Sequence, residues 1–116
     1  MMVTKHKIKS AEDWQLLKNS IDRKTLIFKF SPMCGVSYSV ERKFNKWLDE
    51  ISENENLNFA RLNVITSRAL SREIADELNI QHESPQLIWL DEEGRVKWHA
   101  SHYDITEDEL NSNLRK

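Results

Sequence analysis

The stretch KFSPMCGVSYSV, from Lys29 to Val40, contains the only cysteine of this 116-residue chain. It overlaps the apolar run TLIFKF at residues 25–30, which is typical of a central strand covered on both faces. Beyond it, apolar residues recur with helical spacing at Val40, Phe44, Trp47, Leu48 and Ile51. The stretch therefore predicts a strand, a short turn that holds Cys34, and a long helix that begins near this cysteine.

Helical and strand-like segments alternate on both sides of this junction. Before it, apolar residues recur three or four apart behind Ser10, an N-cap residue type, and predict a helix over roughly residues 11–21. After it, LNFARLNV at residues 57–64 predicts a second strand, and SRALSREIADELN at residues 67–79 predicts a further helix. Alternation of this kind requires a parallel crossover between strands.

The last third of the chain predicts a hairpin and a final helix. Residues 86–90 and 96–100 are strand-like, and Gly94 lies in the acidic turn between them, where a positive φ is expected. A T-x-x-E capping box at residues 106–109 predicts a helix over residues 107–115. The predicted fold class is therefore α/β, with a central mixed sheet flanked by helices on both faces.

Composition and charge limit the class of partner. The chain is 39% apolar and 31% charged, and its length suits one domain over residues 1–116. Its 17 basic and 19 acidic residues give a net charge of −2 without a basic stripe, so nucleic acid is not an expected partner. No window of about 18 apolar residues predicts a membrane span, and MMVTKHKIKS lacks the apolar core of a signal peptide. We expect a cytoplasmic protein without a membrane partner.

The cysteine count limits the chemistry. One cysteine forms neither an internal disulfide nor a metal-binding Cys cluster, and this favours a reducing compartment. His99 and His102 lack the carboxylate or cysteine spacing of a metal site, so no metal is expected. We expect a monomer, although a single exposed thiol permits a Cys34-linked dimer when the protein is oxidised.

The position of Cys34 favours a reactive thiol over a packing residue. At a strand-to-helix junction, the amides of the first helical turn and the helix dipole stabilise a thiolate. Pro32 helps to end the strand, and Gly35 lets the backbone of a ligand approach the sulfur closely. Both neighbours fit a nucleophilic site.

Two segments carry a family resemblance, FKFSPMCGVS and HESPQLIWLDEEGRV. With the element order above, they resemble a thioredoxin-fold protein in which the CxxC motif has become CxxS, and the resemblance spans nearly the whole chain. More narrowly, the sequence is similar to the bacillithiol-system redox-active family, the monothiol bacilliredoxins. The resemblance places Cys34 at the attacking cysteine, Ser37 at the resolving position, and Ser84-Pro85 at the cis-proline whose preceding residue offers backbone groups to an extended substrate.

The resemblance also implies the reaction and its participants. It implies removal of bacillithiol from mixed disulfides on S-thiolated client proteins, with bacillithiol as a thiol co-substrate and no tightly bound cofactor. Cys34 and Ser37 are the catalytic candidates. The candidates for substrate binding are Met33, Gly35, Val36, Ser84 and Pro85. Two interpretations of Ser37 stay open: an exposed serine in the first helical turn, or a hydrogen-bond donor to the thiolate.

Departures from the family leave alternatives. Gly35 replaces the proline that usually follows the cysteine, and Phe28 stands where many thioredoxins keep a buried acid. CGVS also resembles the CGFS of monothiol glutaredoxins, which would make the chain an iron–sulfur or glutathione-binding protein. A third interpretation is an adaptor that uses the fold for protein contacts only. His82, in the loop before Pro85, is either a surface histidine or a residue that approaches Cys34 and tunes it.

Overall fold

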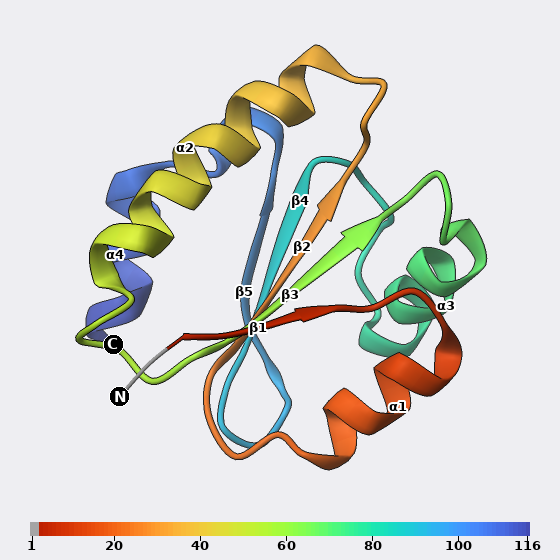
Figure 1. The fold of residues 1–116 in the computed structure, drawn as a ribbon, viewed down its shortest axis with the longest axis horizontal. Helices are drawn as coiled ribbons and strands as arrows, with labels where there is room; N and C mark the ends of the chain where they lie inside the picture. The colour runs from red at the N-terminus through yellow and green to blue at the C-terminus, as the bar shows by residue number, and fades with distance from the viewer. Residues whose placement is uncertain (1–2) are drawn as a thin grey trace.

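The computed structural model describes residues 3–116, so the first two residues of the predicted domain 1–116 lie outside the described part. A five-stranded sheet in the order β1-β3-β2-β4-β5 forms its centre. Figure 1 shows α2 and α4 on one face of this sheet and α1 and α3 on the other. The elements are β1 (Thr4–Lys7), α1 (Ala11–Asn19), β2 (Thr25–Phe30), α2 (Gly35–Ile51), β3 (Asn58–Asn63), α3 (Arg68–Leu78), β4 (Gln86–Leu90), β5 (Val96–Ser101), the 3₁₀ turn η1 (His102–Asp104) and α4 (Glu107–Arg115).

The sheet is mixed, as the sequence predicts. β3 pairs in parallel with β1 and with β2, whereas β4 is antiparallel to β2 and β5 is antiparallel to β4. The β4–β5 hairpin forms as expected, and Gly94 in its turn has a φ of 83°. Strand β1 was not anticipated, because its residues TKHK carry none of the apolar signal of a buried strand and lie at the sheet edge.

Each face of the sheet carries its own hydrophobic cluster. All six residues of β2 are buried, because this strand is central and covered by helices on both sides. The cluster beneath α2 and α4 includes Phe28, Phe44, Trp47, Phe59, Trp89 and Leu110. The cluster beneath α1 and α3 includes Trp14, Leu17, Ile27, Leu62, Ile74 and Ile88. Alternate residues of β2 therefore point to opposite layers, and this alternation places Lys29 on the α1/α3 side.

The helix ends follow the predicted caps. The Asp13 amide donates to Ser10 Oγ at 3.2 Å, and the Glu109 amide donates to Thr106 Oγ1 at 3.2 Å. Helix α4 has the predicted bounds, but α1 ends at Asn19 rather than at residue 21. It ends there because the Ser20 amide and hydroxyl both donate to the Leu17 carbonyl and close the last turn.

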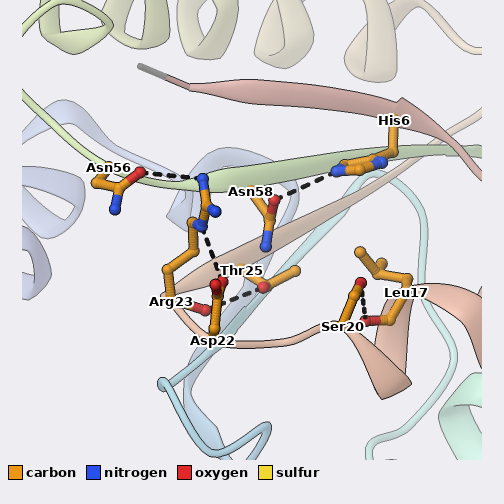
Figure 2. A network of polar contacts seen from close by, with 8 residues as sticks. All are labelled: His6, Leu17, Ser20, Asp22, Arg23, Thr25, Asn56 and Asn58. Atoms are coloured by element: carbon orange, nitrogen blue, oxygen red, sulfur yellow. Dashed lines mark hydrogen bonds and ion pairs between the residues drawn. The ribbon is translucent and has the colours of Figure 1, made fainter. Parts of the chain in front are cut away.

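Polar contacts cluster around the starts of β2 and β3 (Figure 2). Arg23 donates to Asn56 Oδ1 at 3.0 Å and pairs with Asp22 at 2.9 Å. A ring nitrogen of His6 lies 3.2 Å from Asn58 Oδ1. These contacts join the loops at one end of the sheet, and Cys34 lies beyond the other end, after the last residue of β2. No helix among residues 3–116 is long and apolar enough to cross a bilayer.

Candidate functional site

Cys34 is the residue immediately before α2. Its backbone is extended, with φ −121° and ψ 123°, and its side chain is partly exposed. The Cys34 amide donates to the Ser31 carbonyl at 3.3 Å, and the Tyr38 amide donates to the Cys34 carbonyl at 3.1 Å. A tight turn therefore leads directly from the buried strand into the helix. The thiol lies at the helix N-terminus, where unpaired amides and the helix dipole favour negative charge.

The surface around Cys34 is open and partly apolar. A Cβ added at Gly35 would meet no atom within 4 Å, so the space beside this residue is free. Met33 is 83% exposed and Tyr38 is 69% exposed, although both are large apolar side chains. Exposed apolar groups next to a free thiol are suited to contact with a protein surface.

Ser37 is not an exposed serine, so that interpretation is wrong. It is only 1% exposed, and its Oγ accepts a hydrogen bond from the Ser31 amide at 2.9 Å. Position 37 lies three residues before the buried Val40 and so shares the core-facing side of α2. The structure contains no hydrogen bond between the Ser37 hydroxyl and the Cys34 sulfur, both of which it describes. Ser37 instead ties the start of α2 to the end of the preceding strand.

Ser84 and Pro85 lie at the same end of the sheet as the cysteine turn. The Ser84–Pro85 peptide bond is cis, as the resemblance implied. Gln86 follows and pairs with Lys29 near the end of β2. This pairing brings the segment after β2 and the segment before β4 to the same end of the sheet (Figure 1). Pro85 is buried, and its carbonyl accepts from the His102 amide at 2.9 Å.

An ion pair between Arg61 and Glu41, which the sequence analysis missed, joins β3 to the first turns of α2. Arg61 on β3 donates to Glu41 twice, from Nε at 2.6 Å and from an Nη at 3.2 Å. The Arg61 guanidinium carbon also lies 3.6 Å from the centre of the Phe30 ring. Bidentate pairing combined with stacking is specific to arginine. The signal in the sequence was a single arginine inside the apolar strand LNFARLNV.

Lys29 and His82 form a second polar group that the sequence analysis missed. Lys29 is fully buried, its Nζ donates to the Ser71 carbonyl at 2.9 Å, and burial lowers its pKa to about 8. A ring nitrogen of His82 lies 2.9 Å from Ser71 Oγ. Burial, and then the charges of Lys29 and two α3 arginines, lower the His82 pKa. His82 is thus a half-buried residue bonded to Ser71 of α3, which contradicts the surface interpretation.

Phe28 stands where many thioredoxins keep a buried acid, and here it is part of the hydrophobic core. Phe28 is fully buried, and its ring lies 5.0 Å from that of Phe44 on α2. Trp47 and Trp89 are buried in the same layer, whereas Trp98 is only half-buried. Within residues 3–116, no three His, Cys, Asp or Glu side chains are grouped to hold a metal ion.

Comparisons with known proteins agree with this geometry. A protein provisionally assigned as an oxidoreductase with a thioredoxin fold superposes with a TM-score of 0.82 and 27% identity, over 96% of this chain and 94% of its own. Thioredoxin NaTrxh from Nicotiana alata superposes with a TM-score of 0.72 and 17% identity, over 99% of this chain and 93% of its own. Thioredoxin from Trypanosoma brucei brucei superposes with a TM-score of 0.71 and 20% identity, over 94% of this chain and 86% of its own. These matches show a thioredoxin-like fold.

The sequence itself matches one family model. The model is described as monothiol bacilliredoxin BrxC, and it covers residues 6–110, which include the cysteine turn, the Ser84–Pro85 segment and every strand except the start of β1. The single thiol at the start of α2 agrees with the monothiol character of that family. The chain therefore belongs to the monothiol bacilliredoxins and is a monothiol thiol oxidoreductase.

Proposed function

We propose that this protein removes bacillithiol from mixed disulfides on client proteins, with Cys34 as the nucleophile. The observation that carries the proposal is the location of the only thiol, which is partly exposed at the start of α2 beside the open space at Gly35. Thiolates attack disulfides, and a partly exposed thiol can be reached by one. Membership of the bacilliredoxin family supplies the choice of bacillithiol as the small thiol.

The first step is a thiol–disulfide exchange. The Cys34 thiolate attacks the bacillithiol sulfur of the mixed disulfide, the bond between bacillithiol and client breaks, and the client leaves as a thiolate that takes up a proton. Cys34 then carries bacillithiol. No second cysteine exists in the chain, so a second bacillithiol thiolate attacks this adduct. That step releases the Cys34 thiolate and oxidised bacillithiol, which an external reductant returns to the thiol.

In this proposal the remaining site residues bind the substrate or hold the cysteine turn in place. Ser37 keeps the cysteine turn closed through its bond to the Ser31 amide, and in this proposal its part in catalysis is positional. Met33 and Val36 supply apolar contact beside the thiol, and Ser84 with Pro85 lines the opposite side of the substrate. The open approach at Gly35 suits a mixed disulfide, in which two chains must reach one sulfur.

We place this reaction in the cytoplasm, in one domain that acts as a monomer. A single cysteine is typical of a reducing compartment, where a pool of small thiol is available for the second step. Under oxidation without small thiol, the partly exposed Cys34 joins two chains through an intermolecular disulfide.

Intact mass spectrometry tests the proposal. Reduced protein is mixed with a bacillithiolated model client, in parallel with Cys34→Ser and with wild-type protein alkylated at Cys34. We expect one bacillithiol on the unmodified wild type alone, with an equal loss from the client. Transfer that persists in Cys34→Ser overturns the proposal.

The same experiment separates the alternatives. If glutathione is accepted and bacillithiol is not, the chain acts like a glutaredoxin, and anaerobic reconstitution with iron and glutathione then tests for a cluster. If neither thiol is accepted by folded protein, the adaptor interpretation replaces the enzyme.

A further inference from the structure

Lys29 is a buried cation that the transfer chemistry does not use. Its side chain is fully buried on β2, and its Nζ donates one hydrogen bond, to the Ser71 carbonyl. An ammonium group has three N–H donors, and none of the ion pairs among residues 3–116 includes Lys29. Burying a charged group without a counter-charge is costly, so a lysine at this position needs a compensating role.

Ser71 connects Lys29 to the segment that precedes Pro85. This serine is fully buried on α3, where its carbonyl accepts from Lys29 and its hydroxyl lies 2.9 Å from a ring nitrogen of His82. His82 belongs to residues 79–85, which link α3 to β4 and which we call the α3–β4 connection. Strand β2 and the α3–β4 connection are therefore attached to the same residue of α3.

Gln86 provides a second attachment beside the first. It is the register partner of Lys29, so both side chains lie on the same face of the sheet. Gln86 is 1% exposed, and its Nε2 donates to the Gln81 carbonyl at 2.9 Å. Its Oε1 is buried and has no hydrogen-bond partner among the described residues. An unpaired amide oxygen on the same face of the sheet as a buried ammonium is favoured by the field of that positive charge.

The cluster of Lys29, Ser71, His82 and Gln86 thus holds the α3–β4 connection at two points. One contact fixes its middle through His82, and another fixes its first half through the Gln81 carbonyl. Ser84 lies between these contacts and the first residue of β4. The shape of this connection therefore helps to set the position of the Ser84 backbone, together with the bond from the His102 amide to the Pro85 carbonyl.

We propose that Lys29 is a positioning residue of the transfer reaction, which holds the α3–β4 connection through Ser71 so that the Ser84 backbone meets the client. This inference rests on the function proposed above and deepens it. Lys29 touches neither the substrate nor the thiol. Its loss weakens client binding and leaves the reactivity of Cys34 toward small reagents unchanged.

The test compares Lys29→Met, which keeps the length of the side chain without its charge, with Lys46→Met on the exposed side of α2. KM and kcat are measured for transfer from a bacillithiolated client, and Cys34 is titrated separately with iodoacetamide. We expect KM to rise about fivefold in Lys29→Met, the factor for losing one hydrogen bond of ordinary strength. The alkylation rate stays at the wild-type value, and Lys46→Met matches the wild type throughout.

A spectroscopic readout is independent of the enzyme assay. The amide NMR signals of Ser84 and Gln86 shift in Lys29→Met, and the His82 pKa rises, because one of the positive charges that lower it is gone while Arg68 and Arg72 stay. Unchanged Ser84 and Gln86 signals together with an unchanged KM overturn the positioning role. If the wild type transfers no bacillithiol, the proposed function fails, and unshifted signals are then sufficient to overturn the role of Lys29 in holding the connection.

A second variant covers the case in which Lys29→Met does not fold. His82→Phe changes only a half-buried residue of the connection and removes its bond to Ser71. We expect the same direction of change in KM. Where both variants fold, the KM of the double variant should rise by less than the two single effects combined, because both side chains act through Ser71. Additive effects contradict the shared attachment.

Discussion

The Ser31 amide donates a hydrogen bond to Ser37 Oγ at 2.9 Å, and this bond spans the turn that holds Cys34. Cys34 occupies the N-cap position of α2 but caps no amide with its own side chain. Ser37 thus closes the turn from inside the helix, on its buried side. The sulfur therefore makes no capping bond, and the turn is held by a bond that does not involve it.

Removing this hydroxyl should loosen the turn. Ser37→Ala leaves the Ser31 amide without its acceptor, and we expect the free energy of unfolding to fall by about 1–2 kcal/mol. Ser39→Ala is the matched control, because it makes the same change in the same helical turn at a half-buried position. Both variants gain similar helix propensity, so their difference in chemical denaturation isolates the bond. Equal stability of the two variants would show that the bond contributes nothing.

A thiol at position 37 should supply the missing resolving step. Residues three apart at a helix start are neighbours, so Ser37→Cys places a second sulfur within reach of Cys34. After Cys34 has accepted bacillithiol, the introduced thiol should displace it and form an internal disulfide, without a second small thiol. Intact mass should then show oxidised protein in place of the adduct. An adduct as long-lived as that of the wild type would mean that the buried position prevents attack.

The local elements could be predicted because their signals are local. The apolar run of β2 and the stripe from Val40 to Ile51 each lie within one segment, and both elements formed as expected. The capping box likewise predicted α4 with approximately its observed bounds. Strand β1 could not be found this way, because its polar residues gain their place from pairing with β3 alone.

The polar contacts of the site depend on tertiary packing. Lys29 contacts Ser71, a residue 42 positions away, and the sequence contains no local signal for such a pair. The same holds for the contact of His82 with Ser71, which contradicts the surface interpretation of that histidine. Cys34, in contrast, was located by its place at a strand-to-helix junction, a property of neighbouring residues.

The Glu41–Arg61 pair should couple α2 to β3. The pair is bidentate and only partly exposed, at 14% and 38% of the two side chains, so we expect a coupling energy of about 1 kcal/mol. A double-mutant cycle of Glu41→Gln and Arg61→Met measures it by chemical denaturation. Repeating the cycle in 1 M salt should reduce the coupling. Additivity within about 0.3 kcal/mol would leave only the contact with Phe30 to explain the position of Arg61.

Lys29 should make the stability of the protein rise in mild alkali. Burial lowers its pKa from 10.5 to about 8 in the folded chain, whereas the unfolded chain keeps the ordinary value. Between these two pH values the unfolded state binds more protons, so the free energy of unfolding increases with pH. Below pH 8 both states are protonated, and the cost of the buried charge is fully present. At 1.36 kcal/mol per pKa unit, the gain amounts to at most about 3 kcal/mol.

The difference between wild type and Lys29→Met isolates this effect, because all other groups titrate in both proteins. Chemical denaturation is carried out at intervals from pH 7 to pH 10.5. Above about pH 8, the free energy of unfolding of the wild type should increase relative to that of the variant. At pH 7 the variant should be at least as stable as the wild type, since it buries no charge. A constant difference across the range would mean that Lys29 keeps its ordinary pKa. Greater stability combined with weaker client binding in one variant would separate a positioning lysine from a structural one, because loss of a structural lysine lowers both.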